Sequence, residues 1–287
     1  MAEVDSHFHV WELDRFDYPW PNSDVAAIFK TISYPHLTKA LDSSGVKNAV
    51  FVQCLNNNIE EAKWVLKSGH PAIKGVVAGV NLTDHKLLSE QLDELCKFEK
   101  FVGVRHILDM EDSYDWVMGQ DVIEGLKLVA ARGKTFDFLS RPHHLHHVAT
   151  LAKALPELHI VIDHIAKPHL SKSLQVCPDW RKNIEDAASC SNVFCKISGL
   201  VTEVDPVGHA KSWSPQTFAD HVEVVLAAFG PDRCMIGSDW PVLRLTGTNY
   251  KVVNNLHKTL VSELSEDDQV KVCGGNAAKF YQLKNLD

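Results

Sequence analysis

The sequence predicts a (β/α)8 barrel that residues 1–287 form as a single domain. Three observations lead to this fold class. Eight short apolar runs rich in β-branched residues recur roughly every thirty residues, about the length that a strand, a crossover helix and two loops require. The segments between the runs carry helical periodicity. No linker, low-complexity tract or further repeat divides the chain, so one undivided barrel is expected.

The eight predicted strands are continuous apolar runs and do not alternate between apolar and polar residues. This pattern indicates strands covered on both faces, as in a parallel sheet. The runs occupy residues 3–10, 48–54, 73–80, 101–108, 134–140, 159–165, 193–199 and 234–240. We expect each to supply one strand of a barrel whose helices lie outside.

Two of the intervening helices carry clear end signals. In residues 214–230, Ser214 is a predicted N-cap, Pro215 takes the first helical position and Gly230 ends the helix. Residues 120–133 place their apolar side chains on one side and end on a glycine. Both segments are predicted to pack on the barrel by one face.

Composition excludes several function classes. Hydrophobic residues make up 45% of the chain and charged residues 23%, which are ordinary globular values. The net charge of −8 leaves no basic footprint for nucleic acid or an anionic membrane, so a small-molecule partner is expected. The chain shows neither an apolar run of membrane-spanning length nor a signal peptide, so we expect a cytoplasmic protein. The composition does not specify an oligomeric state.

Seven cysteines are scattered singly along the chain, without any CxxC spacing. An odd number without paired spacing does not suggest a disulfide framework or a zinc knuckle. We expect reduced thiols that act mostly as small apolar groups.

Polar residues stand at most of the predicted strand ends. In a (β/α)8 barrel the active site lies at the carboxyl ends of the strands. His7 and His9 end the first strand, and residues two apart project from the same face of a strand, so their rings should converge. The other strand-end residues are Arg105 and His106, Asp137, His164, Lys196 and Asp239. This set predicts an active site at that end of the barrel.

Seven motifs in order along the chain resemble those of the amidohydrolase superfamily. They read DSHFHVW, FVGVRHIL, FDFLSRP, VIDHIAKP, CKISGLVTEVD, GSDWPV and GGNAAKFYQL. More narrowly, the set is similar to the sugar-lactonase group, which includes L-fuconolactonases and L-rhamnonolactonases. The resemblance covers nearly the whole chain. It implies hydrolysis of a sugar-acid lactone, a cyclic ester, to the hydroxy acid.

The resemblance also implies roles for the strand-end residues. Asp239 would be the general base that activates water, and His7, His9 and His164 would hold or polarise the lactone carbonyl. Substrate contacts are expected from Arg105, His106, Asp137, Lys196, Trp11 and Trp240. Asp163 precedes His164 in the sixth strand and is therefore predicted to point away from the barrel interior.

The metal requirement stays open between two alternatives. Binuclear members of the superfamily carry a lysine at the fourth strand and a histidine at the fifth, whereas this chain has Arg105, His106 and Asp137 there, so a two-metal site is not expected. One alternative is a single zinc or manganese ion on His7, His9 and Asp239, since three N/O ligands leave an open position. The other is metal-independent catalysis by histidine and arginine donors.

Three further features carry weaker expectations. The first loop holds Trp11, Phe16, Tyr18 and Trp20, which either form one wall of the site or pack the loop down. Glu203 and Asp205 are candidates for contacts to substrate hydroxyls. The four histidines of residues 143–147 are interpreted as a solvated helix start that begins at Pro142.

Two other functions remain alternatives to a lactonase. A metal-dependent decarboxylase of the same superfamily shares the HxH pattern and the eighth-strand aspartate, but it normally has the fifth-strand histidine that this chain lacks. A catalytically silent ligand-binding barrel would be favoured by loss of Asp239 or His164. Both residues are present.

Overall fold

Eight parallel strands form one sheet in the order β1 to β8 in the computed structural model, which describes residues 2–170, 175–204 and 212–287. The strands are β1 Val4–Phe8, β2 Asn48–Val52, β3 Ile73–Ala78, β4 Phe101–Ile107, β5 Thr135–Leu139, β6 Ile160–Ile162, β7 Val193–Ile197 and β8 Cys234–Ile236. A parallel bridge between Phe8 and Trp240 joins the last strand to the first. The predicted (β/α)8 barrel is therefore confirmed.

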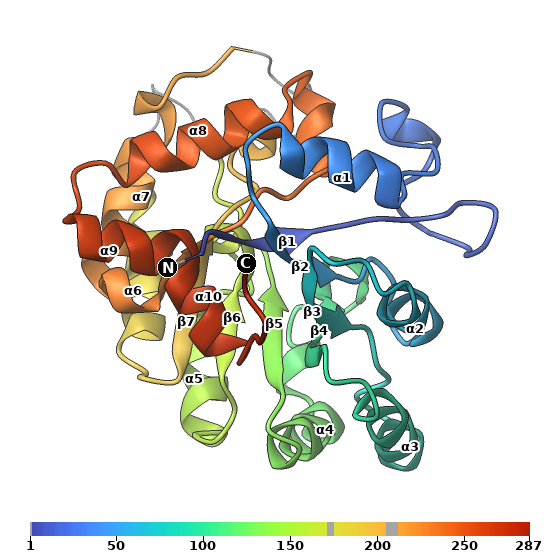
Figure 1. Cartoon of the computed structure of the whole chain (residues 1–287). Helices are drawn as coiled ribbons and strands as arrows, with labels where there is room; N and C mark the ends of the chain where they lie inside the picture. Colours follow the sequence, from blue (N-terminus) through green and yellow to red (C-terminus); the bar gives the residue numbers. More distant parts are fainter. Residues whose placement is uncertain (1, 171–174, 205–211) are drawn as a thin grey trace.

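Helices surround the strands on the outside of the barrel (Figure 1). They are α1 Tyr34–Asp42, α2 Glu60–Lys67, α3 His85–Leu95, α4 Gln120–Ala131, α5 His146–Ala154, α6 Pro178–Ala188, α7 Gln216–Phe229, α8 Tyr250–Leu260, α9 Glu266–Val270 and α10 Asn276–Phe280. Their apolar faces and the outward side chains of the strands form one large buried cluster. This layer is the main core of the protein.

Two predicted helix starts are wrong in detail. The Ser214 hydroxyl does not cap α7; instead the backbone N–H of Ser214 donates to Oγ1 of Thr217 at 3.2 Å. Pro142 begins a turn, and α5 begins only at His146. The predicted end of α4 is confirmed, because Gly133 takes the left-handed conformation that follows the helix.

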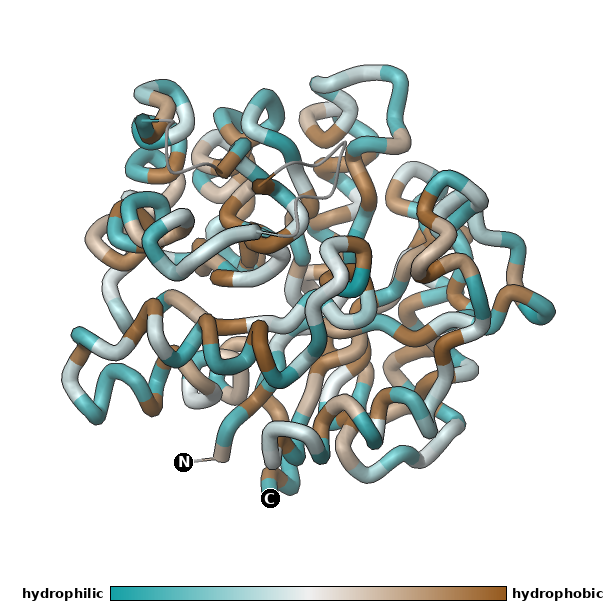
Figure 2. The backbone as a smooth tube through the Cα atoms, turned by 90° about the horizontal axis from the view of Figure 1, so that it is seen from above, coloured by the Kyte–Doolittle hydropathy of each residue, from teal (hydrophilic) through white to brown (hydrophobic). Residues whose placement is uncertain are grey.

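A second apolar cluster fills the barrel interior near the amino ends of the strands. It combines inward residues of seven strands, among them Val4, Val161 and Met235, with Phe280 and Tyr281 at the end of α10. The C-terminal helix therefore closes the amino end of the barrel. Both chain termini lie at this end (Figure 2). The carboxyl end of the strands is left for a binding site.

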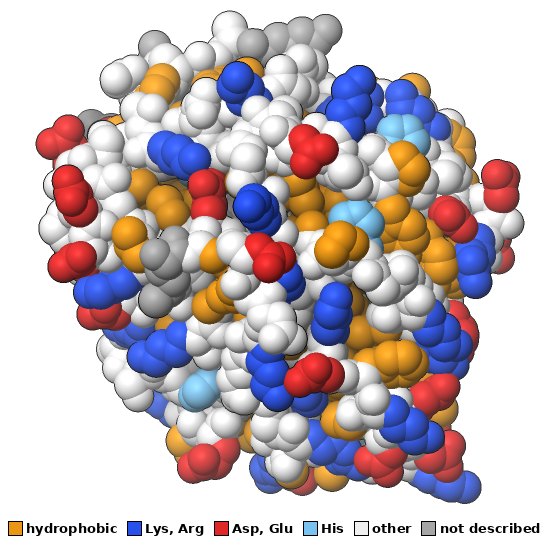
Figure 3. All heavy atoms as spheres, in the orientation of Figure 1, with side chains coloured by type: hydrophobic (Ala, Val, Ile, Leu, Met, Phe, Trp, Pro, Cys, Tyr) orange, Lys and Arg blue, Asp and Glu red, His pale blue; other side chains and the backbone are white. Residues whose placement is uncertain are grey.

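The outer surface carries charges of both signs. Acidic and basic side chains are interspersed over the face shown in Figure 3. None of the helices in the described ranges is long and apolar enough to cross a bilayer. The seven cysteines are all free, as predicted, and four of them are buried.

Candidate active site

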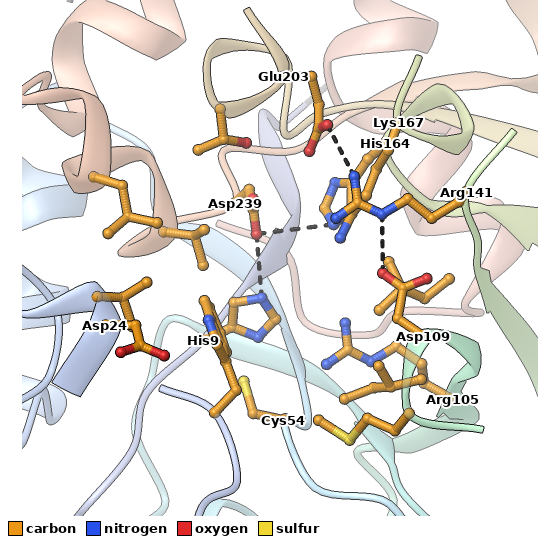
Figure 4. A pocket seen from close by; sticks show the side chains of 18 residues that line it. His9, Asp24, Cys54, Arg105, Asp109, Arg141, His164, Lys167, Glu203 and Asp239 are labelled. Atoms are coloured by element: carbon orange, nitrogen blue, oxygen red, sulfur yellow. Dashed lines mark hydrogen bonds and ion pairs between the residues drawn. The ribbon is translucent and has the colours of Figure 1, made fainter. Parts of the chain in front are cut away.

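A cavity of about 530 Å³ opens at the carboxyl ends of the strands (Figure 4). Its volume lies in the usual range for a small-molecule site. The charged and titratable residues that line it are His9, Asp24, Cys54, Arg105, Asp109, Arg141, His164, Lys167, Glu203 and Asp239. Apolar walls come from residues such as Trp20, Leu139 and Val242.

Asp239 lies at the centre of the predicted histidines. It follows β8 with φ of 56°, and its backbone N–H donates to the carbonyl of His7 at 2.9 Å. Its Oδ1 lies 3.2 Å from Nε2 of His9, 3.9 Å from Nε2 of His164 and 4.0 Å from Nε2 of His7. The structure therefore brings together the four residues that the sequence placed at the centre of the site.

The ring of His9 is held in one protonation state. Its Nδ1 lies 2.6 Å from the carbonyl of Val52, and since a carbonyl only accepts, Nδ1 must carry the proton. Burial lowers the pKa of His9, which keeps the ring neutral. Nε2 of the neutral ring keeps its lone pair 3.2 Å from Oδ1 of Asp239, so the two atoms together can bind a proton or a cation placed between them.

His164 is turned into the cavity by an unusual backbone. Residues 164–167 all have positive φ, and among them Ile165 is β-branched, a residue type that rarely adopts this conformation. Gly199 makes room for the ring, because a Cβ there would lie 2.6 Å from Nδ1 of His164. That Nδ1 pairs with the hydroxyl of Ser198 at 2.8 Å. Local strain is stored at this site and held by the packing around it.

The prediction for Asp163 is wrong. Its side chain is fully buried in the barrel interior, 2.9 Å from Nζ of Lys196 and 3.3 Å from Nδ1 of His7. Asp163 follows the strand alternation from the inward Val161, whereas His164 departs from that alternation through its left-handed backbone. Both side chains consequently point inward.

Lys196 and Asp137 lie below the cavity floor. Nζ of Lys196 contacts Oδ2 of Asp137 at 2.5 Å, and the hydroxyl of Tyr281 donates to the same oxygen at 2.8 Å. Burial raises the pKa of Asp137 to about 6, against the opposing charge of Lys196. Burial alone would raise the pKa of Asp163 too, but Lys196 and neighbouring cations outweigh it and lower that pKa. The cluster supports the site from beneath.

A charged rim lies opposite Asp239. Arg141 donates to Oδ2 of Asp109 at 3.1 Å and to Oε2 of Glu203 at 3.2 Å (Figure 4). Lys167 and Asp24 also line the cavity. Of these five residues, only Glu203 was among the sequence candidates. Arg141 and Lys167 follow β5 and β6 closely, so extending the strand-end criterion by a few residues would have found them.

Several predicted substrate contacts do not line the cavity. His106 pairs with Oε1 of Glu111 at 2.6 Å and stacks on Trp116 at 4.0 Å. Trp11 donates its indole N–H to the carbonyl of Lys30 at 2.8 Å, behind the ring of His9. The residues outside the described lining are His106, Asp137, Lys196, Trp11, Trp240 and also His7. The structure places them as supports, whereas Arg105 faces the cavity.

The first loop divides between the two expected roles. Trp20 lines the cavity, whereas Phe16 packs on Trp64 with ring centroids 5.9 Å apart. The hydroxyl of Tyr18 donates to Oε1 of Glu61 at 2.7 Å and ties the loop to α2. Asp205, the second hydroxyl-contact candidate, lies outside the described residues.

The histidine tract lies behind the rim. Nε2 of His147 is 2.9 Å from Oδ1 of Asp115, and the backbone N–H of Arg141 donates to Nδ1 of His144 at 3.2 Å. His144 and His147 are buried, so the tract is less solvated than predicted. It joins the segment after β4 to the start of α5.

The central cluster contains a set of atoms suited to a metal ion. Ligand atoms of His7, His164 and Asp239 lie within 4.8 Å of one another, and all three residues are buried. The bare Nε2 of His9 faces the same carboxylate. Imidazole nitrogens and a carboxylate oxygen are the ligands that zinc and manganese accept, so these residues fit a single divalent ion.

Comparison with known proteins identifies the family. The model of the family described as Amidohydrolase matches residues 4–283. The chain belongs to the amidohydrolase family. Among its relatives, an L-fucono-1,5-lactonase of Burkholderia ambifaria is 32% identical over 98% of this chain and 95% of the relative. An L-fucono-1,5-lactonase of Burkholderia multivorans is 28% identical over 98% of this chain and 96% of the relative.

Solved structures of amidohydrolases share this fold closely. An amidohydrolase from Burkholderia multivorans with bound HEPES superposes with a TM-score of 0.90 at 27% identity, and covers 99% of this chain and 100% of its own. A second structure of an amidohydrolase from that organism carries bound zinc and superposes with a TM-score of 0.88 at 26% identity, with the same coverage. The fold and the family are thus established together.

Proposed function

We propose that this amidohydrolase opens the lactone of a six-carbon or 6-deoxy sugar acid of the L-fucono-1,5-lactone kind to the free hydroxy acid. The observation that carries the proposal is the geometry of Asp239 and His9. A carboxylate and an unprotonated imidazole nitrogen lie 3.2 Å apart in a cavity of ligand size. The full-length similarity to two L-fucono-1,5-lactonases supports the reaction class.

The charges of the cavity narrow the substrate class. Three cationic and four carboxylate side chains line it, and Arg141 is already paired with Asp109 and Glu203. A cavity with near-balanced charge does not favour a substrate that carries two carboxylates. Paired donors and acceptors suit a neutral ring with several hydroxyls, because each hydroxyl both donates and accepts.

Asp239 and His9 activate the attacking water. A water that donates one hydrogen bond to Oδ1 of Asp239 and the other to Nε2 of His9 has its own lone pairs directed away from both groups, at the substrate. Asp239 takes the proton as the water oxygen adds to the lactone carbonyl. The tetrahedral intermediate then opens the ring, and the leaving alkoxide takes up the proton that Asp239 accepted from water.

Cationic groups stabilise the oxyanion. The guanidinium of Arg105 is buried and lines the cavity, with one arm donating to the carbonyl of Gln53. Lys167 also lines the cavity, as does His164, whose pKa is lowered by burial so that its ring is neutral. Donors held in place in a buried site stabilise developing negative charge without reorganising during the reaction.

A single zinc or manganese ion is part of the proposal. Asp239 and His164, which belong to the closely spaced set, would hold it together with His9, whose Nε2 faces the same carboxylate. His7, the third member of that set, is engaged by Lys196 through Nδ1. Such an ion, when bound, polarises the lactone carbonyl and makes a bound water more acidic.

Prolonged chelation should lower lactonase activity, and added zinc or manganese should restore it, because the ion would supply much of the carbonyl polarisation. Metal content and initial rates are measured on the same samples. Full activity in protein shown to be free of metal would assign the polarisation to Arg105 and the histidines alone.

A panel of lactones and acids tests the substrate class. We expect acid release, followed with a pH indicator in weak buffer, from five- and six-membered aldonolactones, with the highest kcat/KM for six-carbon or 6-deoxy sugars. Pyrone dicarboxylates should be poor substrates because the cavity charges are balanced. The proposal fails if aldonolactones are inert and an aromatic or enol carboxylic acid releases carbon dioxide.

A further inference from the structure

A buried ammonium group lies directly beneath the catalytic cluster. Nζ of Lys196, fully buried, contacts Oδ2 of Asp137 at 2.5 Å, Oδ1 of Asp163 at 2.9 Å and Nδ1 of His7 at 3.1 Å. An ammonium has three protons. Its contacts with Asp137 and His7 are hydrogen bonds, and its contact with Asp163 is an ion pair. The ammonium is thus surrounded by polar groups of β1, β5 and the end of β6.

The three partners of Lys196 form a cation-binding set in their own right. The ligand atoms of His7, Asp137 and Asp163 lie within 4.8 Å of one another, and all three residues are buried. An imidazole and two carboxylates at this spacing suit a divalent ion. We call the space between His7, Asp137 and Asp163 the seat, and we propose that the Lys196 ammonium is the cation that occupies it. By doing so, Lys196 fixes the tautomer of His7 and the orientation of its ring toward Asp239.

The protons of the cluster assign the tautomer of His7. Nδ1 of His7 lies 3.1 Å from Nζ of Lys196 and 3.3 Å from Oδ1 of Asp163. Since an ammonium only donates and is the nearer of the two groups, we assign Nδ1 as the acceptor. A proton on Nδ1 would instead point two donors at each other across 3.1 Å. The proton of the neutral ring therefore lies on Nε2, which has no hydrogen-bond partner among the described residues and faces Oδ1 of Asp239 at 4.0 Å.

The balance of two buried cations against two buried carboxylates explains why a lysine side chain is stable in the seat. Lys196 and Arg105 offset the carboxylates of Asp137 and Asp163, with Arg105 3.9 Å from Oδ2 of Asp163. Removing one partner of a buried charge cluster leaves the others uncompensated, which is strongly destabilising. A divalent ion is the natural replacement, because it supplies positive charge to the same acceptors.

Lys196 is accordingly a positioning residue, and it acts through His7. That the position of His7 matters for catalysis by Asp239 rests on the proposed lactonase function. The occupation of the seat by Lys196 does not. Metal uptake, stability and NMR report on Lys196 directly, so their outcome is separate from that of the lactone assay.

The decisive experiment replaces the resident cation. We expect Lys196→Ala to be less stable than the wild type without metal and to bind one more equivalent of Co²⁺ than the wild type, with new visible absorption bands. With Co²⁺ at about a hundred times its Kd, the thermal midpoint of the variant should rise by roughly 5–10 °C more than that of the wild type.

The matched control is Lys196→Ala combined with Asp137→Asn. This double variant removes the ammonium together with one carboxylate, so the cluster stays balanced and the seat loses a ligand. It should gain neither the extra equivalent of Co²⁺ nor the additional stabilisation. Equal rescue of both variants, or no extra ion in Lys196→Ala, overturns the proposal.

Two further measurements cover a variant that does not fold without metal. Refolding of Lys196→Ala with and without Co²⁺ then becomes the test: recovery only with Co²⁺ supports the proposal, and failure under both conditions contradicts it. In the wild type, ¹⁵N NMR of labelled histidines, assigned with a His7→Ala variant, should show His7 protonated at Nε2. Protonation at Nδ1 would refute the orientation claimed for Lys196.

Discussion

Asp239→Asn should lower kcat by roughly 10²- to 10⁴-fold, the usual contribution of a positioned general base, while KM changes little. The amide has nearly the same volume as the carboxyl group but cannot accept the proton from water. The backbone should hold, because asparagine tolerates the positive φ found at residue 239. Steady-state kinetics on the best aldonolactone, with circular dichroism as a check on folding, measures the effect.

The matched control is Asp24→Asn, a second carboxylate on the cavity wall that lies apart from Asp239 (Figure 4). Its kcat should stay within a few-fold of the wild type. If Asp239→Asn instead kept its kcat and changed only KM, Asp239 would be a binding residue. The base would then have to be sought among His7, His9 and His164.

Glu61 should make the stability of the protein depend on pH by about 3 kcal/mol. Its carboxyl group is fully buried at the start of α2, and burial raises its pKa from 4.5 to about 7. Because the folded-state pKa lies above the unfolded one, the folded protein binds this proton more tightly. The stabilisation is complete below about pH 4.5 and is lost as the pH rises through about 7.

Glu61→Gln isolates this contribution. The amide keeps a hydrogen bond from the backbone N–H of Cys54 through its oxygen, and its NH₂ group donates to the hydroxyl of Tyr18. Burial also raises the pKa of Asp5, to about 6, but that effect is common to both proteins. Urea unfolding from pH 4.5 to 8 should show the wild type losing about 3 kcal/mol relative to Glu61→Gln. Parallel stability curves would contradict the assignment.

The carboxyl ends of the strands could be located from the sequence because the strands of a parallel barrel have a distinctive local composition. Each strand is buried on both faces and reads as an apolar run, so the first polar residue after it marks the carboxyl end. His7 and His9 lie two residues apart at the end of β1, and their convergence on Asp239 is visible in the structure at 3.2 and 4.0 Å. Similarity of ordered motifs then indicated the family.

The criterion failed where the backbone left the strand. Asp163 was predicted to point outward and His164 inward, by simple alternation. The left-handed turn of residues 164–167 breaks that alternation, so both side chains face the interior. No periodic pattern encodes such a turn, because its strain is held by distant packing, including the space that Gly199 leaves.

Local sequence was therefore enough to locate the strands, the carboxyl end of the barrel and the four central residues, since burial and strand periodicity act within a few residues. Only the folded chain decided which strand-end groups line the cavity and which support it. Lys196 and Asp137 look like site residues in the sequence, yet they neutralise each other beneath the floor. Arg141 meets Glu203 at the rim, 62 positions away in the chain. Buried charges must find partners across the barrel, and those partners are set by three-dimensional proximity.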